Sequence, residues 1–193
     1  RRSSDLKPQR QENRIARKDR MNPAKHFDHN SRILVVGTSG AGKSTLARKI
    51  ALTLGIKDIE LDALHWGPDW TETPLEVFEG LVRREIQENR GFVIHGNYTK
   101  IQGITWGSGD TVVWLDYTKT VVMWRVLTRT LRRIIAKEKL WAGNVETFRK
   151  SFLGKDSIIA WAWNTYPRRK EQFSRLYEEN PYRIQTLLRF KKP

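Results

Sequence analysis

One short segment constrains the fold of this chain more than any other. It consists of Gly37, Thr38, Ser39, Gly40, Ala41, Gly42, Lys43, Ser44 and Thr45. The glycines allow successive backbone N–H groups to curl inward around phosphate oxygens. The apolar residues 33–36 before it are typical of a buried strand, and residues 46–54 after it read as a helix that ends at Gly55. This order predicts a site for a nucleoside triphosphate, because the N-terminus of a helix attracts anions.

Two side chains of this segment, which we call the phosphate loop, have predicted chemical roles. Lys43 is expected to reach the outer phosphates, where its charge would act in catalysis. The Ser44 hydroxyl is expected to bind Mg²⁺. The remaining residues of the loop are expected to contact the nucleotide mainly through the backbone.

The composition limits the classes of protein to which the chain can belong. Its 193 residues are enough for one domain with a buried core. No stretch approaches the roughly 18 apolar residues of a membrane helix, and no apolar signal-peptide centre is evident. The chain has no cysteine, which excludes disulfides and thiolate metal sites. We therefore expect an intracellular protein without membrane contact.

The net charge of +15 is concentrated in two segments. Residues 1–32 carry ten Lys or Arg and four Asp or Glu, and residues 119–175 carry fourteen and four, so the remainder sums to −1. Residues 1–30 lack apolar periodicity and predict a mostly disordered basic arm. A solvated tail is the favoured interpretation of this arm, and a contact for nucleic acid is the alternative. The internal basic segment fits a lid over a polyanionic nucleotide at least as well as a nucleic-acid surface.

From residue 31 onwards the pattern alternates between strands and helices. This alternation predicts an α/β fold with a parallel sheet covered on both faces. Further strands are expected at residues 57–61, 91–95, 111–115 and 182–187, and further helices after Pro74 with Thr73 as cap, at about 120–137 and at about 157–179. Ligands of such sheets bind at the carboxyl ends of the strands. The loops after Leu61, His95 and Asp116 should therefore surround the phosphate loop.

Two carboxylates and a histidine follow predicted strands. Asp62 is the first candidate for the acidic group, either orienting Mg²⁺ or accepting the proton of an attacking hydroxyl, with capping of the next turn as the alternative. Asp116 could anchor Mg²⁺, but capping the following helix is the favoured role. His95 stands where parallel-sheet phosphotransferases often have a carboxylate. A neutral imidazole cannot replace that charge near a metal, although it could bind substrate.

The predicted helix at about residues 120–137 gathers arginines on one side. Arg125, Arg129, Arg132 and Arg133 fall within about 100° of arc. Clustered guanidinium groups suit the charge of a phosphoryl group in transfer, and a solvated face is the alternative. Among the residues that follow, only Glu138 is an acid within a turn or two, which favours the functional interpretation. The adjoining face is apolar and is expected to pack, through Val121, Trp124, Leu127, Leu131 and Ile135.

Eight tryptophans are a high number for a chain of this length. Aromatic rings in loops near a phosphate site could stack on a base or line an acceptor pocket, although packing is the more usual role. Trp66 and Trp70 are the best candidates for contact with substrate, because they follow Asp62 closely in the sequence. The tryptophans in predicted loops are Trp66, Trp70, Trp106 and Trp141.

Several segments together resemble one known family. They are similar to the adenylate-kinase-related proteins described as DNA topology modulation (FlaR-like) proteins, over roughly residues 31–178. The segments that carry the resemblance include Asp62, His65 and Trp66 in the first and Asn97 in the second. They are residues 62–70, 92–98, 110–116, 125–133, 140–146 and 163–166.

The resemblance implies a fold and a set of ligands. It implies a P-loop NTPase three-layer fold like that of adenylate and shikimate kinases, with a five-stranded parallel sheet in residues 31–193 and a helical lid at about residues 125–155. It also implies ATP and Mg²⁺ at the phosphate loop, with Asp62 and Asn97 facing the acceptor. The family usually has Asp where this chain has His95.

The leading functional hypothesis is an ATP-dependent kinase whose acceptor is a nucleoside, a nucleotide or a small hydroxylated metabolite. Lys43 and Ser44 with Mg²⁺ would hold the γ-phosphate, Asp62 would orient the acceptor, and the arginines would stabilise developing charge. One alternative is a nucleotide-dependent nucleic-acid-binding protein that uses the basic arm. Another is a degenerate kinase fold without turnover, which His95 would indicate.

Overall fold

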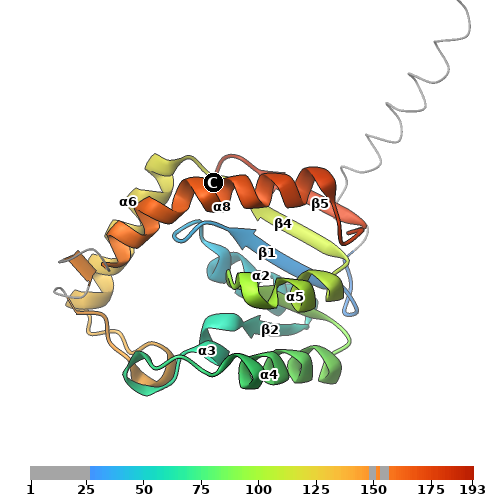
Figure 1. The fold of residues 1–193 in the computed structure, drawn as a ribbon, viewed down its shortest axis with the longest axis horizontal. Coiled ribbons are helices and arrows are strands. Elements are labelled where there is room, and N and C mark those ends of the chain that lie inside the picture. Colours follow the sequence, from blue (N-terminus) through green and yellow to red (C-terminus); the bar gives the residue numbers. More distant parts are fainter. Residues whose placement is uncertain (1–26, 148–150, 153–156) are drawn as a thin grey trace, which may run out of the picture.

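The computed structural model describes residues 27–147, 151–152 and 157–193 of the chain (Figure 1). Residues 1–26 of the predicted basic arm therefore lie outside the described residues. The same holds for residues 148–150 and 153–155 of the predicted lid. Within the described ranges, no helix is long and apolar enough to span a lipid bilayer.

The centre of the fold is a sheet of five parallel strands in the order β2-β3-β1-β4-β5 (Figure 1). In the register of the central strand β1, Val35 lies between His95 of β3 and Val113 of β4. These three strands are almost entirely buried, as strands covered on both faces must be. The predicted five-stranded parallel sheet is confirmed. The strands are β1 Arg32–Gly37, β2 Lys57–Glu60, β3 Phe92–His95, β4 Thr111–Leu115 and β5 Thr186–Phe190.

Helices cover both faces of this sheet and complete three layers. Helices α2 and α6 pack on the face that carries Val35 and Val113. Helices α4 and α5 and the second half of α8 pack on the face that carries Leu34 and Ile94. The helices are α2 Lys43–Leu54, α3 Leu61–His65, α4 Leu75–Glu88, α5 Gln102–Ser108, α6 Lys119–Ile135 and α8 Ile158–Glu179. The described residues also form the 3-10 turns η2 Pro68–Trp70, η3 Thr99–Ile101 and η4 Trp141–Gly143.

Two predictions about the second strand and the helix after it were wrong. Strand β2 ends at Glu60, and Asp62 lies in the first turn of the short helix α3 rather than at the end of the strand. Thr73 does not cap α4, which begins at Leu75. Its hydroxyl instead donates a hydrogen bond to the backbone oxygen of Leu64, so it joins α3 to the segment before α4.

The last strand begins later than predicted, at Thr186 rather than at residue 182. The side chain of Asn180 accepts a hydrogen bond from the backbone N–H of Ile184 and donates one to its backbone oxygen. These two bonds hold the residues after α8 in a turn, so the apolar alternation there does not begin a strand. Helix α5 was not predicted, and Trp106, expected in a loop, lies within it in the core.

Candidate functional site

The phosphate loop joins β1 to α2 in a conformation that depends on glycine. Gly40 and Gly42 have φ angles of 81° and 94°, which residues with a Cβ atom rarely adopt. A Cβ atom at Gly40 would lie 2.5 Å from Cγ2 of Val126, so the loop packs directly on α6. Helix α2 begins at Lys43, and no side chain caps its first turn. The N–H groups of that turn therefore remain suited to an anion.

Lys43 is a buried cation at the end of this loop. Its Nζ donates a hydrogen bond to the backbone oxygen of Thr38 at 3.0 Å. Burial lowers the pKa of Lys43 from 10.5 to about 8 against the attraction of Asp62, while Arg129 and Arg169 lower it further. These four charged groups are close enough to interact, and three of them are positive.

This lowered pKa makes the stability of the protein depend on pH. Because the folded protein binds the Lys43 proton less tightly than the unfolded chain does, the free energy of unfolding should rise between about pH 8 and pH 10.5. The full gain is on the order of 3 kcal/mol. The Lys43→Met variant has no charge to bury and should lack this contribution. Urea unfolding of both proteins between neutral and alkaline pH provides the measurement, and parallel stability curves would contradict the burial of a charged Lys43.

The arginines of α6 occupy different environments. Arg129 is largely buried and its Nε is fully buried, and among the described residues it makes no hydrogen bond or ion pair, although Glu146 and Asp62 lie close enough to interact with its charge. Burial lowers the pKa of Arg129, and its neighbour Arg133 lowers it further. Arg133 is neutralised by Glu146, whose Oε1 lies 2.9 Å from its Nη1. Arg129 is thus a cation without a countercharge bound to it.

The other two arginines of α6 do not face the same space. Arg125 donates a hydrogen bond to the backbone oxygen of Ala41 at 3.1 Å, and its guanidinium lies over the ring of Tyr117. It therefore supports the phosphate loop from the side of α6. The side chain of Arg132 is 73% exposed and pairs with Glu138, away from the loop.

Arg169 on α8 adds a third cation, and a short basic run at residues 168–170 was its only signal in the sequence. Its guanidinium donates hydrogen bonds to the backbone oxygen of Asn97 at 3.1 Å and to the hydroxyl of Thr99 at 2.9 Å. Neither partner carries a charge, and burial lowers the pKa of Arg169. Asn97 in turn donates from Nδ2 to the backbone oxygen of Gly37 at 2.7 Å. A continuous set of hydrogen bonds therefore joins α8 to the start of the phosphate loop.

Asp62 has a fixed orientation beside these cations. The hydroxyl of Tyr98 donates a hydrogen bond to Oδ1 of Asp62 at 2.6 Å. Burial raises the pKa of Tyr98, and the charges of Asp62 and Glu72 raise it further, so this hydroxyl remains a donor. The carboxylate is thus held by a side chain of the loop after β3 and is not engaged in capping a turn.

These groups line one cavity of about 1010 Å³. The predicted residues Trp66 and Asn97 line it, whereas Arg125 and Arg132 do not. Charged side chains occupy one part of the lining, and aromatic rings occupy another. The charged and polar side chains include Ser39, Lys43, Asp62, Glu72, Asn97, Arg129, Arg133, Glu146 and Arg169, and the rings are His65, Trp66, Trp70, Phe78, Tyr98, Trp141 and Trp161.

The segment after α6 closes one side of this cavity. Asn144 is buried there, and its side chain accepts a hydrogen bond from the backbone N–H of Trp70 at 3.1 Å and donates one to the backbone oxygen of Gly67 at 2.9 Å. The rings of Trp70 and Trp141 meet edge to face, with centroids 6.3 Å apart. Figure 1 shows this segment reaching from α6 to the neighbourhood of α3. Both polar and aromatic contacts therefore join η4 to η2.

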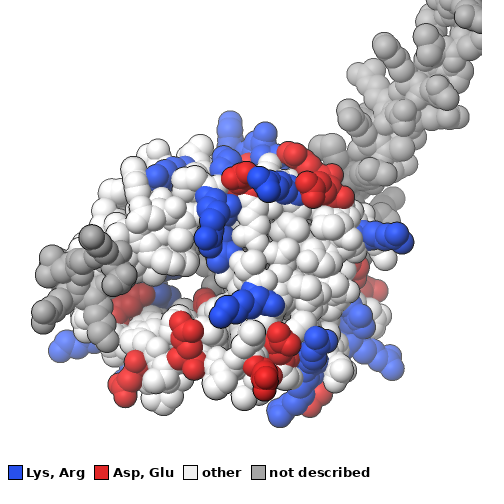
Figure 2. All heavy atoms as spheres, in the orientation of Figure 1, with Lys and Arg blue, Asp and Glu red and all other residues white. Residues whose placement is uncertain are grey.

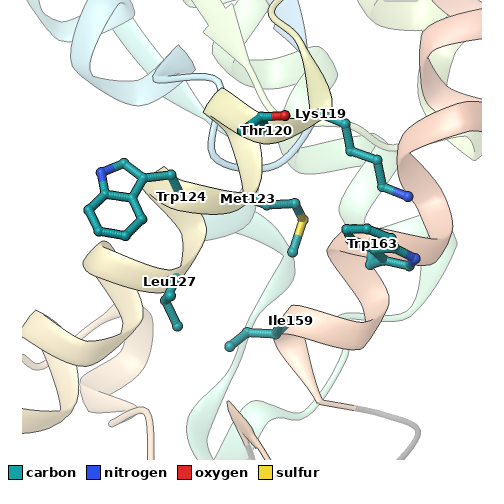
Figure 3. A pocket seen from close by; sticks show the side chains of 7 residues that line it. All are labelled: Lys119, Thr120, Met123, Trp124, Leu127, Ile159 and Trp163. Carbon is teal, nitrogen blue, oxygen red and sulfur yellow. The ribbon is translucent and has the colours of Figure 1, made fainter.

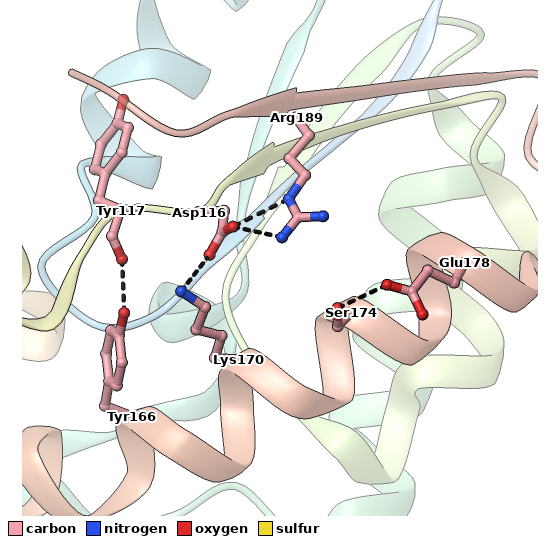
Figure 4. A network of polar contacts seen from close by, with 7 residues as sticks. All are labelled: Asp116, Tyr117, Tyr166, Lys170, Ser174, Glu178 and Arg189. Atoms are coloured by element: carbon pink, nitrogen blue, oxygen red, sulfur yellow. Dashed lines mark hydrogen bonds and ion pairs between the residues drawn. The ribbon is translucent and has the colours of Figure 1, made fainter.

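Asp116 does not have either of the roles considered for it. It is buried, its Oδ2 accepts a hydrogen bond from Arg189 at 2.7 Å, and its Oδ1 lies 3.3 Å from Nζ of Lys170 (Figure 4). The residue that precedes the first turn of α6 is Thr118, so Asp116 does not cap that helix. Its carboxylate is occupied in joining β4 to β5 and α8.

His95 is also held by a partner within the fold. It is 2% exposed, and its Nε2 lies 3.1 Å from Oδ1 of Asp58 on β2. His95 is not among the residues that line the cavity. The imidazole therefore lies against a carboxylate of the neighbouring strand, without hydrogen-bond geometry between the two atoms, and the hydrogen bond to substrate that we considered has no geometric support.

The apolar face that α6 was expected to bury is partly exposed. Trp124 and Ile135 are 65% and 81% exposed, because α6 packs on the sheet through Val122, Val126 and Thr130. The buried face of α6 is thus rotated about the helix axis relative to the face that was predicted to be buried. Of these two exposed side chains, Trp124 contributes to a groove between α6 and α8 (Figure 3) that is lined by Lys119, Thr120, Met123, Trp124, Leu127, Ile159 and Trp163.

The surface charges in view are mixed in sign. On the face shown in Figure 2, Lys and Arg side chains are interspersed with Asp and Glu. The nucleic-acid contact was assigned to the basic arm, which lies outside the described residues as far as residue 26. That contact stays a prediction.

Comparisons with known proteins define the fold class. No protein-family model matches the chain, and neither does any curated protein. Among solved structures, the chain is similar to the crystal structure of a gluconokinase from Sinorhizobium meliloti 1021, with a TM-score of 0.51 and 17% sequence identity over 86% of each chain. The chain therefore shares the three-layer α/β fold of this structure. At this sequence identity the likeness concerns the arrangement of the backbone.

Proposed function

We propose that this protein is an ATP-dependent kinase that transfers the γ-phosphate to a hydroxyl group of a small molecule. The observation that carries the proposal is the cluster of Lys43, Arg129 and Arg169 around Asp62, in one cavity beside the phosphate loop. An excess of buried positive charge favours an anion, and a carboxylate there can accept a proton. The resemblance to FlaR-like proteins adds support, as does the fold shared with the gluconokinase structure.

Each group has a distinct role in the proposed reaction. The N–H groups of the phosphate loop and Lys43 bind the outer phosphates of ATP, and Arg129 binds oxygens of the phosphoryl group in transfer. The acceptor hydroxyl attacks the γ-phosphorus, so that a new P–O bond forms while the bond to ADP breaks. The hydroxyl proton passes to Asp62. Because Tyr98 occupies Oδ1, the second oxygen of Asp62 is left for this proton.

The residues also fit a Mg²⁺ ion bound together with ATP. Such an ion would supply positive charge to the phosphate groups, and the Ser44 hydroxyl would be the protein group that holds it. In the part of the chain that the structure describes, no three His, Asp or Glu side chains are grouped to hold a metal. An ion at a phosphate loop takes most of its ligands from phosphates and water, with the Ser44 hydroxyl in the first turn of α2 as the protein ligand. We assign Asp62 to the acceptor rather than to the metal.

The direct test is a transfer assay. The protein is incubated with γ-labelled ATP, Mg²⁺ and a pooled panel of nucleosides, nucleoside monophosphates and hydroxylated metabolites. Label on an acceptor is the expected result. Binding of ATP with only slow hydrolysis, across the whole panel, would contradict the kinase and favour the degenerate fold.

Asp62→Asn should lower kcat by at least about a hundredfold, the usual contribution of a general base. Its effect on ATP affinity should be small, because the substitution removes no group that binds phosphate. Asp69→Asn is the matched control: Asp69 is exposed on η2 and does not line the cavity. Steady-state kinetics and calorimetric titration with ATP measure the two effects. Unchanged kcat in Asp62→Asn would exclude Asp62 as the base.

A further inference from the structure

One part of the cavity is built from aromatic side chains that contact one another. We call this set the ring wall. The centroid of the His65 ring lies 4.6 Å from Tyr98, 4.8 Å from Trp66 and 5.0 Å from Phe78. The wall continues from Trp66 to Trp70 at 5.8 Å and from Trp70 to Trp141 at 6.3 Å. Its members are His65, Trp66, Trp70, Phe78, Tyr98 and Trp141, and all six line the cavity.

The geometry of the wall leaves flat apolar surface for a ligand. Its ring contacts are edge-on or tilted, with interplanar angles between 55° and 80°, so none of the rings stacks face to face on its neighbour. Trp66, Trp70 and Trp141 are only partly buried, unlike the core tryptophan Trp114. Partly exposed rings that line a cavity bury their remaining apolar area when a flat ring stacks against them.

The charges beside the ring wall disfavour an anion. Asp62 accepts a hydrogen bond from Tyr98, and Oε2 of Glu72 lies 4.0 Å from Nε2 of His65. Both carboxylates raise the pKa of Tyr98 in addition to the effect of burial. The cation Arg133 is already paired with Glu146. A carboxylate or phosphate group on the acceptor would therefore be repelled at the wall.

The wall also contains one polar atom without a partner. Nδ1 of His65 is buried and has no hydrogen-bond partner among the described residues. Such an atom carries a free-energy cost, which a polar ligand atom that reached Nδ1 would relieve. Tyr98 belongs both to the wall and to the hydrogen bond with Asp62. A ligand ring on the wall therefore lies next to the proposed base.

We propose that the acceptor is a neutral compound that carries a flat aromatic ring and a hydroxyl group, as a nucleoside does, and that its ring binds on the ring wall. The proposal rests on the proposed kinase function. The hydroxyl oxygen forms the new bond to the γ-phosphorus, its proton passes to Asp62, and ADP leaves. Sugar acids and nucleoside monophosphates are expected to be poorer acceptors, because Asp62 and Glu72 lie beside the wall, whereas the cations Lys43 and Arg129 are assigned to the phosphates of ATP.

Tryptophan fluorescence tests binding without any need for turnover. The protein is titrated with a set of nucleosides and simple aromatic alcohols, a nucleoside monophosphate, and gluconate as a charged polyol. Saturable quenching by neutral ring compounds is expected, with at least about tenfold weaker binding of the monophosphate and none of gluconate. Trp163→Phe is the control for nonspecific quenching, because Trp163 lies in the groove between α6 and α8 and not in the cavity. The same compounds are then offered with γ-labelled ATP.

Two substitutions at one position separate stacking from packing. Trp66→Leu keeps an apolar side chain but removes the ring, and it should weaken ring binding about tenfold, the loss expected for one stacking partner. Trp66→Phe keeps a ring, so its affinity for ring compounds should stay within about threefold of that of the native protein. Equal losses in both variants would mean that Trp66 only packs, and would overturn its role in stacking.

The outcomes distinguish this proposal from the kinase itself. Absence of saturable binding by every ring compound overturns the ring site, whatever the transfer assay shows. Preferred transfer to gluconate or to a monophosphate overturns the acceptor class and leaves the kinase standing. Saturable binding of ring compounds without any transfer supports the ring wall as a binding site and overturns the kinase.

Discussion

Lys43→Met is expected to reduce phosphoryl transfer about a thousandfold while the protein stays folded. The ammonium is the cation closest to where the outer phosphates are expected, and the loss of one such preorganised group costs about this much. Methionine has a similar length and no charge, so it fills the same buried space. At neutral pH the variant should be more stable than the native protein, because it no longer buries a cation whose pKa is lowered to about 8.

The matched control for Lys43→Met is Lys49→Met on the same helix. Lys49 is exposed on α2 and does not line the cavity. Its substitution should leave both turnover and ATP affinity unchanged. Steady-state kinetics, titration with ATP and thermal unfolding are measured for all three proteins. Native turnover in Lys43→Met, or loss of its folded structure, would contradict the assigned role.

Arg129→Met is expected to lower activity and raise stability at the same time. Arg129 is buried without a bound countercharge, so the free protein bears the cost of holding it. Transfer should fall by about a thousandfold, as when an arginine that stabilises a phosphoryl group is removed. The free energy of unfolding should rise by about 1 kcal/mol or more, because a buried unpaired charge is replaced by an apolar group. Opposite signs in the two measurements distinguish a ligand-binding arginine from a structural one.

The same substitution at Arg132 supplies the comparison. Arg132 lies on the same helix but is exposed and paired with Glu138. Arg132→Met should change neither turnover nor stability by more than a surface substitution usually does, about 0.5 kcal/mol. If Arg129→Met proved less stable than Arg132→Met, the guanidinium of Arg129 would have a structural partner, and the proposed role in transfer would lose its basis.

The sheet and the phosphate loop could be predicted because their signals are local. A buried strand, a glycine-rich loop and a helix follow one another within residues 33–55, and each depends on its immediate neighbours. The turn after α8 shows the limit of such reasoning. The apolar alternation around Ile184 predicted a strand, but the hydrogen bonds from Asn180 hold those residues in a turn. Side-chain bonds to the backbone override periodicity there.

The arginines of α6 show why the site could be predicted only in part. An arc of about 100° placed Arg129 and Arg132 together, although only Arg129 lines the cavity. The rotation of α6 is set by Val122 and Val126, which pack beneath the phosphate loop around Gly40. That contact joins residues far apart in the chain, so the orientation of α6 cannot be predicted from the helix sequence alone.

Contacts between distant segments also account for what was missed. Arg169 meets Asn97 across 72 positions of sequence, and a basic run at residues 168–170 was its only signal. The ring wall draws on α3, η2, α4, η4 and the loop after β3. Trp66 and Trp70 were singled out because they follow Asp62. The neighbouring rings of Phe78 and Trp141 are brought to them only by the fold.

The pair formed by His95 and Asp58 has a consequence for how this chain can change over evolutionary time. If a carboxylate were introduced at the end of β3 through His95→Asp alone, it would stand beside Asp58, whose Oδ1 now lies 3.1 Å from the imidazole. The aspartate side chain is shorter than that of histidine, so the two carboxylates would lie further apart than this, but two neighbouring carboxylates that are largely shielded from water still repel each other, which disfavours the ionisation of both. The substitution is therefore epistatic: it becomes tolerable only after, or together with, a neutral residue at position 58. We therefore expect positions 58 and 95 to change together rather than one at a time.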